Sequence, residues 1–263
     1  MRSVFCCPGL KQFKYALVWI YLLKSKNQVF EKFKEFKLLV EKQFDLKIKC
    51  IRSDNGGEYI SNECLNYLKS EGIVHERTVP KSPEQNGVAE RMNRSLVEAV
   101  RTMLEDAHLS REFWAEALST AVYLRNRCPT SALTGKTPLE ALTSVKPNVS
   151  NLRTFGCICY SHISKDERQK LDAKSVKCIL LGYGIHVKGY RLFDLEKRKV
   201  FYSRDVIFNE SEKIDTQSQK ESVVDNVHNY EFQVPLQDEI LTEPAEEPVR
   251  PQRVNCSEYA QRT

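Results

Sequence analysis

The first 80 residues alternate short apolar segments with amphipathic ones, and this order constrains the fold most strongly. The apolar segments are rich in aromatic and β-branched residues, as buried strands are. Between them, apolar side chains recur at helical spacing. The predicted order is a strand at 15–23, a helix at 27–44, a strand at 47–53, a helix at 61–70 and a strand at 73–79. This order predicts an α/β layer with parallel strand pairing.

A longer amphipathic segment follows a loop with prolines at 80 and 83. Asn86 is a favourable N-cap residue, and residues 87–107 continue without proline. At 100° per residue, the apolar side chains of this helix share one face: Met92, Leu96, Ala99, Val100 and Met103. The opposite face carries Glu90, Arg94, Val97 and Arg101. Two more helices are predicted, at 111–126 and 138–142.

From residue 155 the pattern changes to short alternating strands, at 155–163, 177–183, 189–194 and 199–208. We expect a small antiparallel β-barrel or sheet, separate from the α/β domain. Beyond residue 209 the chain is acidic and contains four prolines, which is typical of a disordered linker.

Charge is distributed unevenly along the chain. Residues 210–263 carry 12 acidic and 5 basic groups, a formal charge of −7. The whole chain carries +5, so residues 1–209 carry +12. A basic body is typical of a protein that binds a polyanion such as nucleic acid, although a solvated basic surface without a partner gives the same pattern.

Several protein classes are excluded by composition. With 41% hydrophobic residues, the chain has enough apolar side chains for a core and is not wholly disordered. Its longest apolar run, at 15–23, is too short to span a bilayer, so we expect no membrane association. No secretory signal is recognisable. Nine cysteines without a regular framework indicate reduced thiols and a cytoplasmic or nuclear location.

Two carboxylates stand where reactive groups are expected. Asp54 follows the strand at 47–53, and Glu90 lies in the first turn of the helix that begins at residue 87. Together they could bind divalent cations, which activate water or a hydroxyl group against a phosphodiester. Both positions also have ordinary structural explanations, because Asp54 begins a turn and Glu90 favours a helix N-terminus.

Two motifs identify a resemblance to a known family. The segments SDNGGEY at 53–59 and SPEQNGVAERMNRSL at 82–96 resemble the integrase core of copia-type retrotransposon Pol polyproteins. The similarity continues through FWAEALSTAVYLRNRCPTSAL and KTPLEAL and covers about residues 15–209. It implies an RNase H-like (retroviral integrase-type) core at 15–145, a small SH3-like β-domain at 152–209 and an acidic disordered tail at 210–263.

The resemblance also implies an activity and its residues. Such integrases are DDE-type polynucleotidyl transferases that join element ends to target DNA with Mg²⁺ or Mn²⁺. Asp54 and Glu90 match the second and third carboxylates of the triad, and would be the catalytic and metal-binding residues. The residues expected to face DNA are Asn86, Arg91, Asn93, Arg94 and Arg101. A homo-oligomer is a possible further partner.

The sequence departs from the family near its N-terminus. Family members carry the first Asp on a strand just before the segment at 15–26, but here that stretch reads CPGLKQF and no acidic residue precedes Glu31. We therefore expect residues 1–14 to be an atypical segment of a copy truncated on its N-terminal side. They would fill the sheet edge poorly. Without one triad carboxylate, we expect nucleic-acid binding without efficient catalysis.

Other interpretations of the function and of single residues stay open. The chain could be an active metal-dependent integrase or nuclease that recruits another carboxylate, or a host-adopted protein-interaction module. Cys157, Cys159, His162 and Cys178 could be zinc ligands, although buried free cysteines are common in protein cores. His75, in a predicted strand, is more consistent with a structural role than with a catalytic base.

Overall fold

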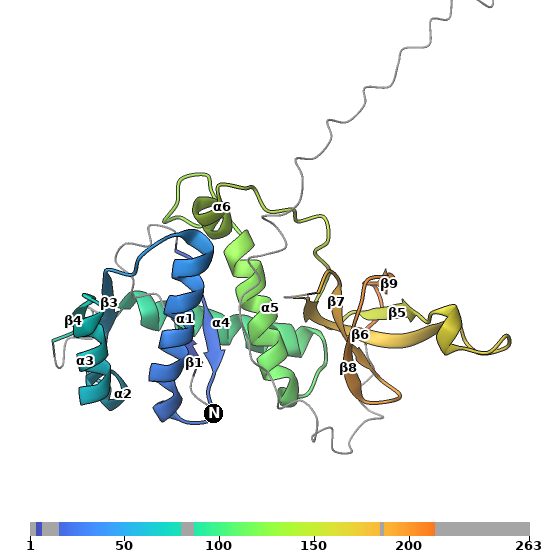
Figure 1. Cartoon of the computed structure of the whole chain (residues 1–263). Coiled ribbons are helices and arrows are strands. Elements are labelled where there is room, and N and C mark those ends of the chain that lie inside the picture. The colour runs from blue at the N-terminus through green and yellow to red at the C-terminus, as the bar shows by residue number, and fades with distance from the viewer. Residues whose placement is uncertain (1–3, 7–15, 80–86, 185–186, 214–263) are drawn as a thin grey trace, which may run out of the picture.

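The computed structural model describes residues 4–6, 16–79, 87–184 and 187–213. Figure 1 shows an α/β part next to a smaller β-sheet. Within these ranges, no helix is both long and apolar enough to cross a membrane. The predicted N-cap Asn86 and its proline-containing loop lie outside the described residues, as does the expected disordered tail from residue 214 onward.

The α/β part follows the predicted order. Its elements are β1 (Val4–Cys6), β2 (Ile20–Leu22), α1 (Val29–Phe44), β3 (Cys50–Ser53), α2 (Gly57–Ile60), α3 (Asn62–Ser70) and β4 (Val74–Arg77), with a 3-10 turn at Lys26–Gln28 before α1. β3 and β4 pair in parallel with Ser53 opposite Arg77, which confirms the predicted parallel pairing. Ser61 caps α3 by accepting a hydrogen bond from the Cys64 amide at 3.3 Å, as expected for an N-cap serine.

The strands form two separate pairs instead of one continuous layer. β1 and β2 are antiparallel, with Cys6 opposite Ile20, so a strand does precede the segment at 15–23. The expected strand at 15–23 is short in the structure. One reason is that the backbone of Val18 is bonded to a side chain: Asn126 accepts from the Val18 amide and donates to its carbonyl, both at 2.9 Å.

Two long helices lie between the α/β part and the smaller sheet. They are α4 (Gly87–Asp106) and α5 (Trp114–Arg127), with a 3-10 turn at Arg111–Phe113 between them, and α6 (Pro138–Thr143) follows. All three confirm the predicted helices. Buried Leu96 of α4 packs with Ile20 of β2 and Val18 before it, and with Leu118 and Val122 of α5. Figure 1 shows α4 beginning on the side of β3 and β4 and running toward α5.

The smaller sheet is open. Its strands are β5 (Ile158–His162), β6 (Ser175–Tyr183), β7 (Tyr190–Asp194), β8 (Lys199–Ser203) and β9 (Val206–Asn209), in the order β8-β7-β6-β5-β9, and a 3-10 turn lies at Lys165–Glu167. Only Arg204 and Asp205 separate the two edge strands in sequence. The chain bends there, and the Asp205 carbonyl accepts a hydrogen bond from the His162 amide at 3.0 Å. β8 and β9 do not pair with each other, so the prediction of a closed barrel is wrong.

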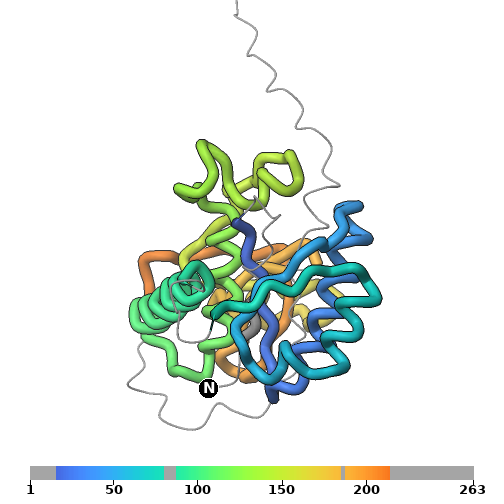
Figure 2. The backbone as a smooth tube through the Cα atoms, turned by 90° about the vertical axis from the view of Figure 1, so that its left-hand side faces the viewer, coloured from blue at the N-terminus to red at the C-terminus, as the bar shows by residue number. Residues whose placement is uncertain are grey.

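The smaller sheet shares a core with the helices instead of standing apart from them. Leu104 and Ala107 at the end of α4, together with Phe113 and Ala117, pack against side chains of the sheet region. These sheet residues are Phe155, Ile158, Ile179, Leu181 and Phe193. Figure 2, turned by 90°, also shows the sheet behind the α/β part and next to the helices. A second cluster, on the other side of the sheet, contains Cys157, Cys159, Cys178, Leu180 and Leu192.

Candidate nucleic-acid interface

Asp54 lies immediately after β3 at the end of the parallel pair, as predicted, and it is exposed. Its Oδ1 accepts a hydrogen bond from the Gly56 amide at 3.0 Å, which fixes one carboxylate oxygen in a turn. The neighbouring Asn55 donates from Nδ2 to the Thr78 carbonyl at 2.8 Å. The turn is therefore attached to the chain that leaves β4, and the free part of the Asp54 carboxylate faces solvent.

The hydroxyl of Ser53 and the imidazole of His75 hold the backbone of this turn in place. Ser53 is buried, and its Oγ donates to the Asp54 carbonyl at 2.8 Å. His75 Nε2 lies 2.9 Å from the same Oγ. Because the hydroxyl proton is used by the Asp54 carbonyl, the geometry favours the tautomer in which Nε2 donates. Burial, followed by the charge of Arg77, lowers the pKa of His75, which is consistent with the predicted structural role.

The exposed face of α4 agrees with the helical pattern in the sequence. Leu96 is buried, and Met92, Ala99, Val100 and Met103 are partly buried against the core. Glu90, Arg94, Val97 and Arg101 are exposed on the opposite side, and Arg91 and Asn93 are exposed as well. None of the three arginines forms an ion pair with another described residue. Their guanidinium groups are therefore available to phosphate oxygens.

Asp54 and Glu90 are the two residues predicted to bind a metal ion. Asp54 and Glu90 are both exposed, at the end of β3 and in the first turn of α4. No group of three or more His, Cys, Asp or Glu side chains among the described residues is arranged to hold a metal ion. Mg²⁺ is commonly held by one or two carboxylates together with water and substrate phosphates, so Asp54 and Glu90 stay predicted metal ligands.

The four residues considered as alternative zinc ligands are divided between the core and the surface. Cys157, Cys159 and Cys178 are buried in an apolar cluster, whereas His162 is exposed. Burial raises the pKa of the Cys157 thiol to about 11 and that of Cys178 to about 12, and raises the pKa of Cys159 still further. Thiols that resist ionisation are poor metal ligands, so these cysteines are core residues.

Two features of the region were not predicted from the sequence. The Ser53–His75 contact joins residues 22 positions apart, and the parallel register of β3 and β4 is what brings them together. The second is the ion pair between Lys213, just after the last strand, and Asp106 at the end of α4. A single lysine in an acidic segment gives no sequence signal for such a pair.

Comparisons with known proteins identify relatives of the chain. The family described as the retroviral polymerase SH3-like domain matches residues 157–222. A retrovirus-related Pol polyprotein from transposon TNT 1-94 of Nicotiana tabacum is 51% identical over 195 residues, which cover 74% of this chain and 15% of that protein. The Pol polyprotein from transposon RE1 of Arabidopsis thaliana is 39% identical over 193 residues, covering 73% of this chain and 13% of the relative.

Similar solved structures include two retroviral integrase core domains. The catalytic core of BIV integrase has a TM-score of 0.37 and 22% identity, and covers 51% of this chain and 80% of that chain. The HTLV-2 integrase catalytic core in complex with magnesium has a TM-score of 0.38 and 20% identity, and covers 54% of this chain and 93% of that chain.

The relatives are much longer than this chain, which spans about 15% of the tobacco polyprotein. The matching region nevertheless covers about three quarters of this chain. The predicted resemblance to a Pol polyprotein is thereby confirmed. The chain is homologous to a segment of the retrovirus-related Pol polyproteins of plant transposons.

Proposed function

We propose that this chain is an integrase-related nucleic-acid-binding protein whose DNA-contacting surface is the exposed face of α4. The observation that carries the proposal is the presentation of Arg91, Arg94 and Arg101, exposed and unpaired with described residues, on a helix packed firmly by its opposite face. Duplex DNA, from element ends or a target, is the partner that the homology to retrotransposon Pol polyproteins suggests.

The chemistry of binding follows from the type of side chain. Guanidinium groups form bidentate hydrogen bonds with phosphate oxygens and release condensed counterions from DNA. Asn93, exposed on the same helix, adds an amide that can donate to a phosphate or a base edge. Glu90 and Glu98 lie among these arginines and repel phosphate, so the contact is restricted to the positions of the guanidinium groups.

The proposal does not include efficient strand transfer. In an RNase H-like core at 15–145, Asp54 and Glu90 would be the acidic residues nearest the reaction. The described residues supply no third ligating group beside them. Two exposed carboxylates hold a divalent ion weakly, and in-line transfer at a phosphodiester needs a firmly positioned one. We therefore propose binding without catalysis.

A binding experiment tests the surface. Fluorescence anisotropy with a labelled duplex should give an affinity that falls steeply with salt. Arg94→Ala should weaken binding several-fold and reduce the salt slope by about one. Arg111→Ala removes an exposed arginine outside α4 and is the matched control. Binding that is indifferent to salt and to Arg94→Ala would instead support a protein-interaction module.

A second experiment tests the absence of catalysis. The full chain is incubated with Mn²⁺ and a labelled duplex, and nicking and strand transfer are measured beside the Asp54→Asn variant. We expect no product from either protein. Product that appears with the native chain and disappears in Asp54→Asn would overturn this part of the proposal. It would favour the active metal-dependent enzyme that uses a substitute carboxylate.

A further inference from the structure

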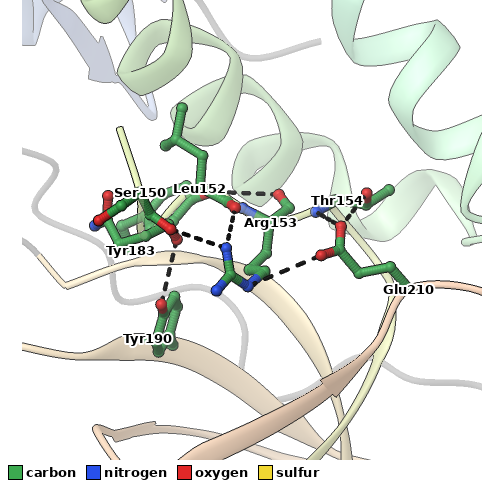
Figure 3. A network of polar contacts seen from close by, with 8 residues as sticks. Ser150, Leu152, Arg153, Thr154, Tyr183, Tyr190 and Glu210 are labelled. Atoms are coloured by element: carbon green, nitrogen blue, oxygen red, sulfur yellow. Dashed lines mark hydrogen bonds and ion pairs between the residues drawn. The ribbon is translucent and has the colours of Figure 1, made fainter. Parts of the chain in front are cut away.

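The last described residues attach the C-terminal segment to the body of the protein. Glu210 Oε2 accepts hydrogen bonds from the Thr154 amide at 2.9 Å and from the Thr154 hydroxyl, and Glu210 Oε1 lies 3.8 Å from Arg153 Nε (Figure 3). Glu212 lies 3.3 Å from Lys177 Nζ and accepts from Asn209 Nδ2 at 2.9 Å. Residues 209–213 therefore follow a defined path.

That path ends at α4. Lys213 forms an ion pair with Asp106, the last residue of the helix. Lys213, the last described residue, is therefore attached to the C-terminal end of the helix that carries Arg91, Arg94 and Arg101.

The segment that begins there is complementary in charge to this face. Residues 214–231 contain Asp215, Glu221, Asp225 and Glu231 and only one basic residue, Lys220. The arginines of α4 form no ion pair with any described residue. Carboxylates and phosphate oxygens compete for the same guanidinium hydrogen-bond donors.

The segment is long enough to cover all three arginines. A helix rises 1.5 Å per residue, so Arg101 lies about 7.5 Å and Arg91 about 22 Å along the axis from Asp106. A chain spans at most about 3.3–3.6 Å per residue. Asp215, two residues beyond Lys213, spans at most about 7 Å and falls short of Arg101. Glu221, eight residues beyond, spans about 26–29 Å and can reach Arg91 as well as the two nearer arginines.

We propose that residues 214–231 occupy the arginine face of α4 in the absence of DNA and compete with it for Arg91, Arg94 and Arg101. This inference rests on the proposed function, and adds to it an intramolecular inhibitor of DNA binding. The inhibitor acts by charge, so it weakens as salt screens the carboxylates.

The test neutralises the four acidic groups in the full chain. The variant carries Asp215→Asn, Glu221→Gln, Asp225→Asn and Glu231→Gln. The matched control carries four substitutions of the same type farther along: Glu243→Gln, Glu246→Gln, Glu247→Gln and Glu258→Gln. Both variants change the net charge by the same amount. The control carboxylates are farther along the chain, and closing a longer loop onto α4 is entropically less favourable. Neutralising them should therefore relieve less of the competition with DNA for the α4 arginines.

Duplex binding is measured by anisotropy at low and at moderate salt. The first variant should bind about 10-fold more tightly than the native chain at low salt, and the control should gain less than half of that on a logarithmic scale. The difference should shrink as salt is added. Equal gains in the two variants, or no gain in either, would overturn the inference while leaving DNA binding by α4 intact.

A measurement without DNA separates this inference from the proposed function. The side-chain Nε–Hε signals of Arg91, Arg94 and Arg101 are observed by NMR and assigned through Arg→Lys variants. They should shift between the native chain and the first variant at low salt, and not in the control. If no protein binds DNA but these signals shift, the proposed function fails and the intramolecular contact stands. Unchanged signals would refute the contact.

Discussion

The carboxylate of Glu116 on α5 and the guanidinium of Arg191 on β7 form a two-pronged ion pair across the boundary between helices and sheet. Arg191 Nε donates to Oε2 at 2.9 Å and Nη2 donates to Oε1 at 3.0 Å. Both side chains are buried, at 1% and 8% exposed. A third guanidinium nitrogen, Nη1, donates to the Tyr202 hydroxyl at 2.8 Å, so the pair extends to β8.

Removing one member of this pair should destabilise the protein strongly. In Glu116→Ala the buried Arg191 guanidinium loses both carboxylate bonds, and we expect a loss of about 3–5 kcal/mol in the free energy of unfolding. Urea denaturation measures this change. The double variant Glu116→Leu/Arg191→Met removes both charges and should recover much of the loss. If the double variant is no more stable than Glu116→Ala, then the loss comes from removing the ion pair itself and not from leaving the Arg191 charge without a partner.

The same boundary predicts how the protein unfolds. Thr120 of α5 donates to the Leu181 carbonyl at 2.8 Å, and Tyr123 stacks on Tyr183 with ring centroids 4.3 Å apart. With this shared core, the helices and the small sheet should unfold in one transition. Tryptophan fluorescence follows Trp19 and Trp114, while far-ultraviolet circular dichroism follows the whole chain. Two separated transitions would mean that the sheet is an independent domain.

Asn126 should be more important for stability than its residue type suggests. Its amide satisfies both the N–H and the C=O of Val18, which are buried. In Asn126→Ala both groups lose their partner, and we expect about 2–4 kcal/mol of destabilisation. Asn126→Asp keeps an acceptor for the Val18 amide but removes the donor to its carbonyl and buries an unpaired carboxylate beside it. It should therefore be at least as destabilising as Asn126→Ala in urea denaturation at neutral pH.

These residues show which parts of the structure the sequence predicts. Helical spacing correctly indicated α1, α4 and α5 and the exposed face of α4, because amphipathic periodicity reports burial directly. Asn126 and Glu116 gave no such signal. Their partners are 108 and 75 residues away, so only the tertiary fold defines their roles. The closed barrel was predicted because alternating strands look alike in open and closed sheets, and the bend at Arg204 and Asp205 was not visible.

The candidate site likewise combines features that the local sequence pattern predicts with features that depend on the tertiary fold. The position of Asp54 at a strand end and the exposure of Glu90, Arg94 and Arg101 followed from local pattern. The support of Asp54 by Ser53 and His75 depends on the register between β3 and β4, which no local pattern specifies. The ion pair between Lys213 and Asp106 depends on where β9 ends in space.

Gly156 should tolerate no side chain. It has φ of +73°, and an added Cβ would overlap the Cβ of Ala107 at the end of α4. Gly135 has a similar φ of +71° but open space around its missing Cβ. Gly135→Ala should therefore cost only about 1 kcal/mol from backbone strain, whereas Gly156→Ala should cost about 3 kcal/mol or more. Thermal or urea denaturation measures both losses: Gly135→Ala reports backbone strain alone, and Gly156→Ala reports strain together with overlap on Ala107. Equal losses would contradict the close packing of α4 on the sheet.

The buried thiols predict a loss of stability at alkaline pH. Burial raises the pKa of Cys157 to about 11 and of Cys178 to about 12 from an ordinary value of 9.0, while the unfolded chain keeps the ordinary value. Above pH 9 the unfolded state therefore binds fewer protons than the native state, and stability falls as pH rises toward the native pKa values.

The expected loss is about 1 kcal/mol per thiol at pH 10, with full stability kept below pH 8. Urea denaturation between pH 7 and 10 measures it. The variant Cys157→Ala/Cys178→Ala is less stable at neutral pH because it leaves small cavities, but it lacks two of the titrating groups. Its stability should therefore change less with pH than that of the native chain. A parallel pH dependence in both proteins would assign the alkaline loss to other groups, such as Tyr183, whose pKa burial also raises to about 12.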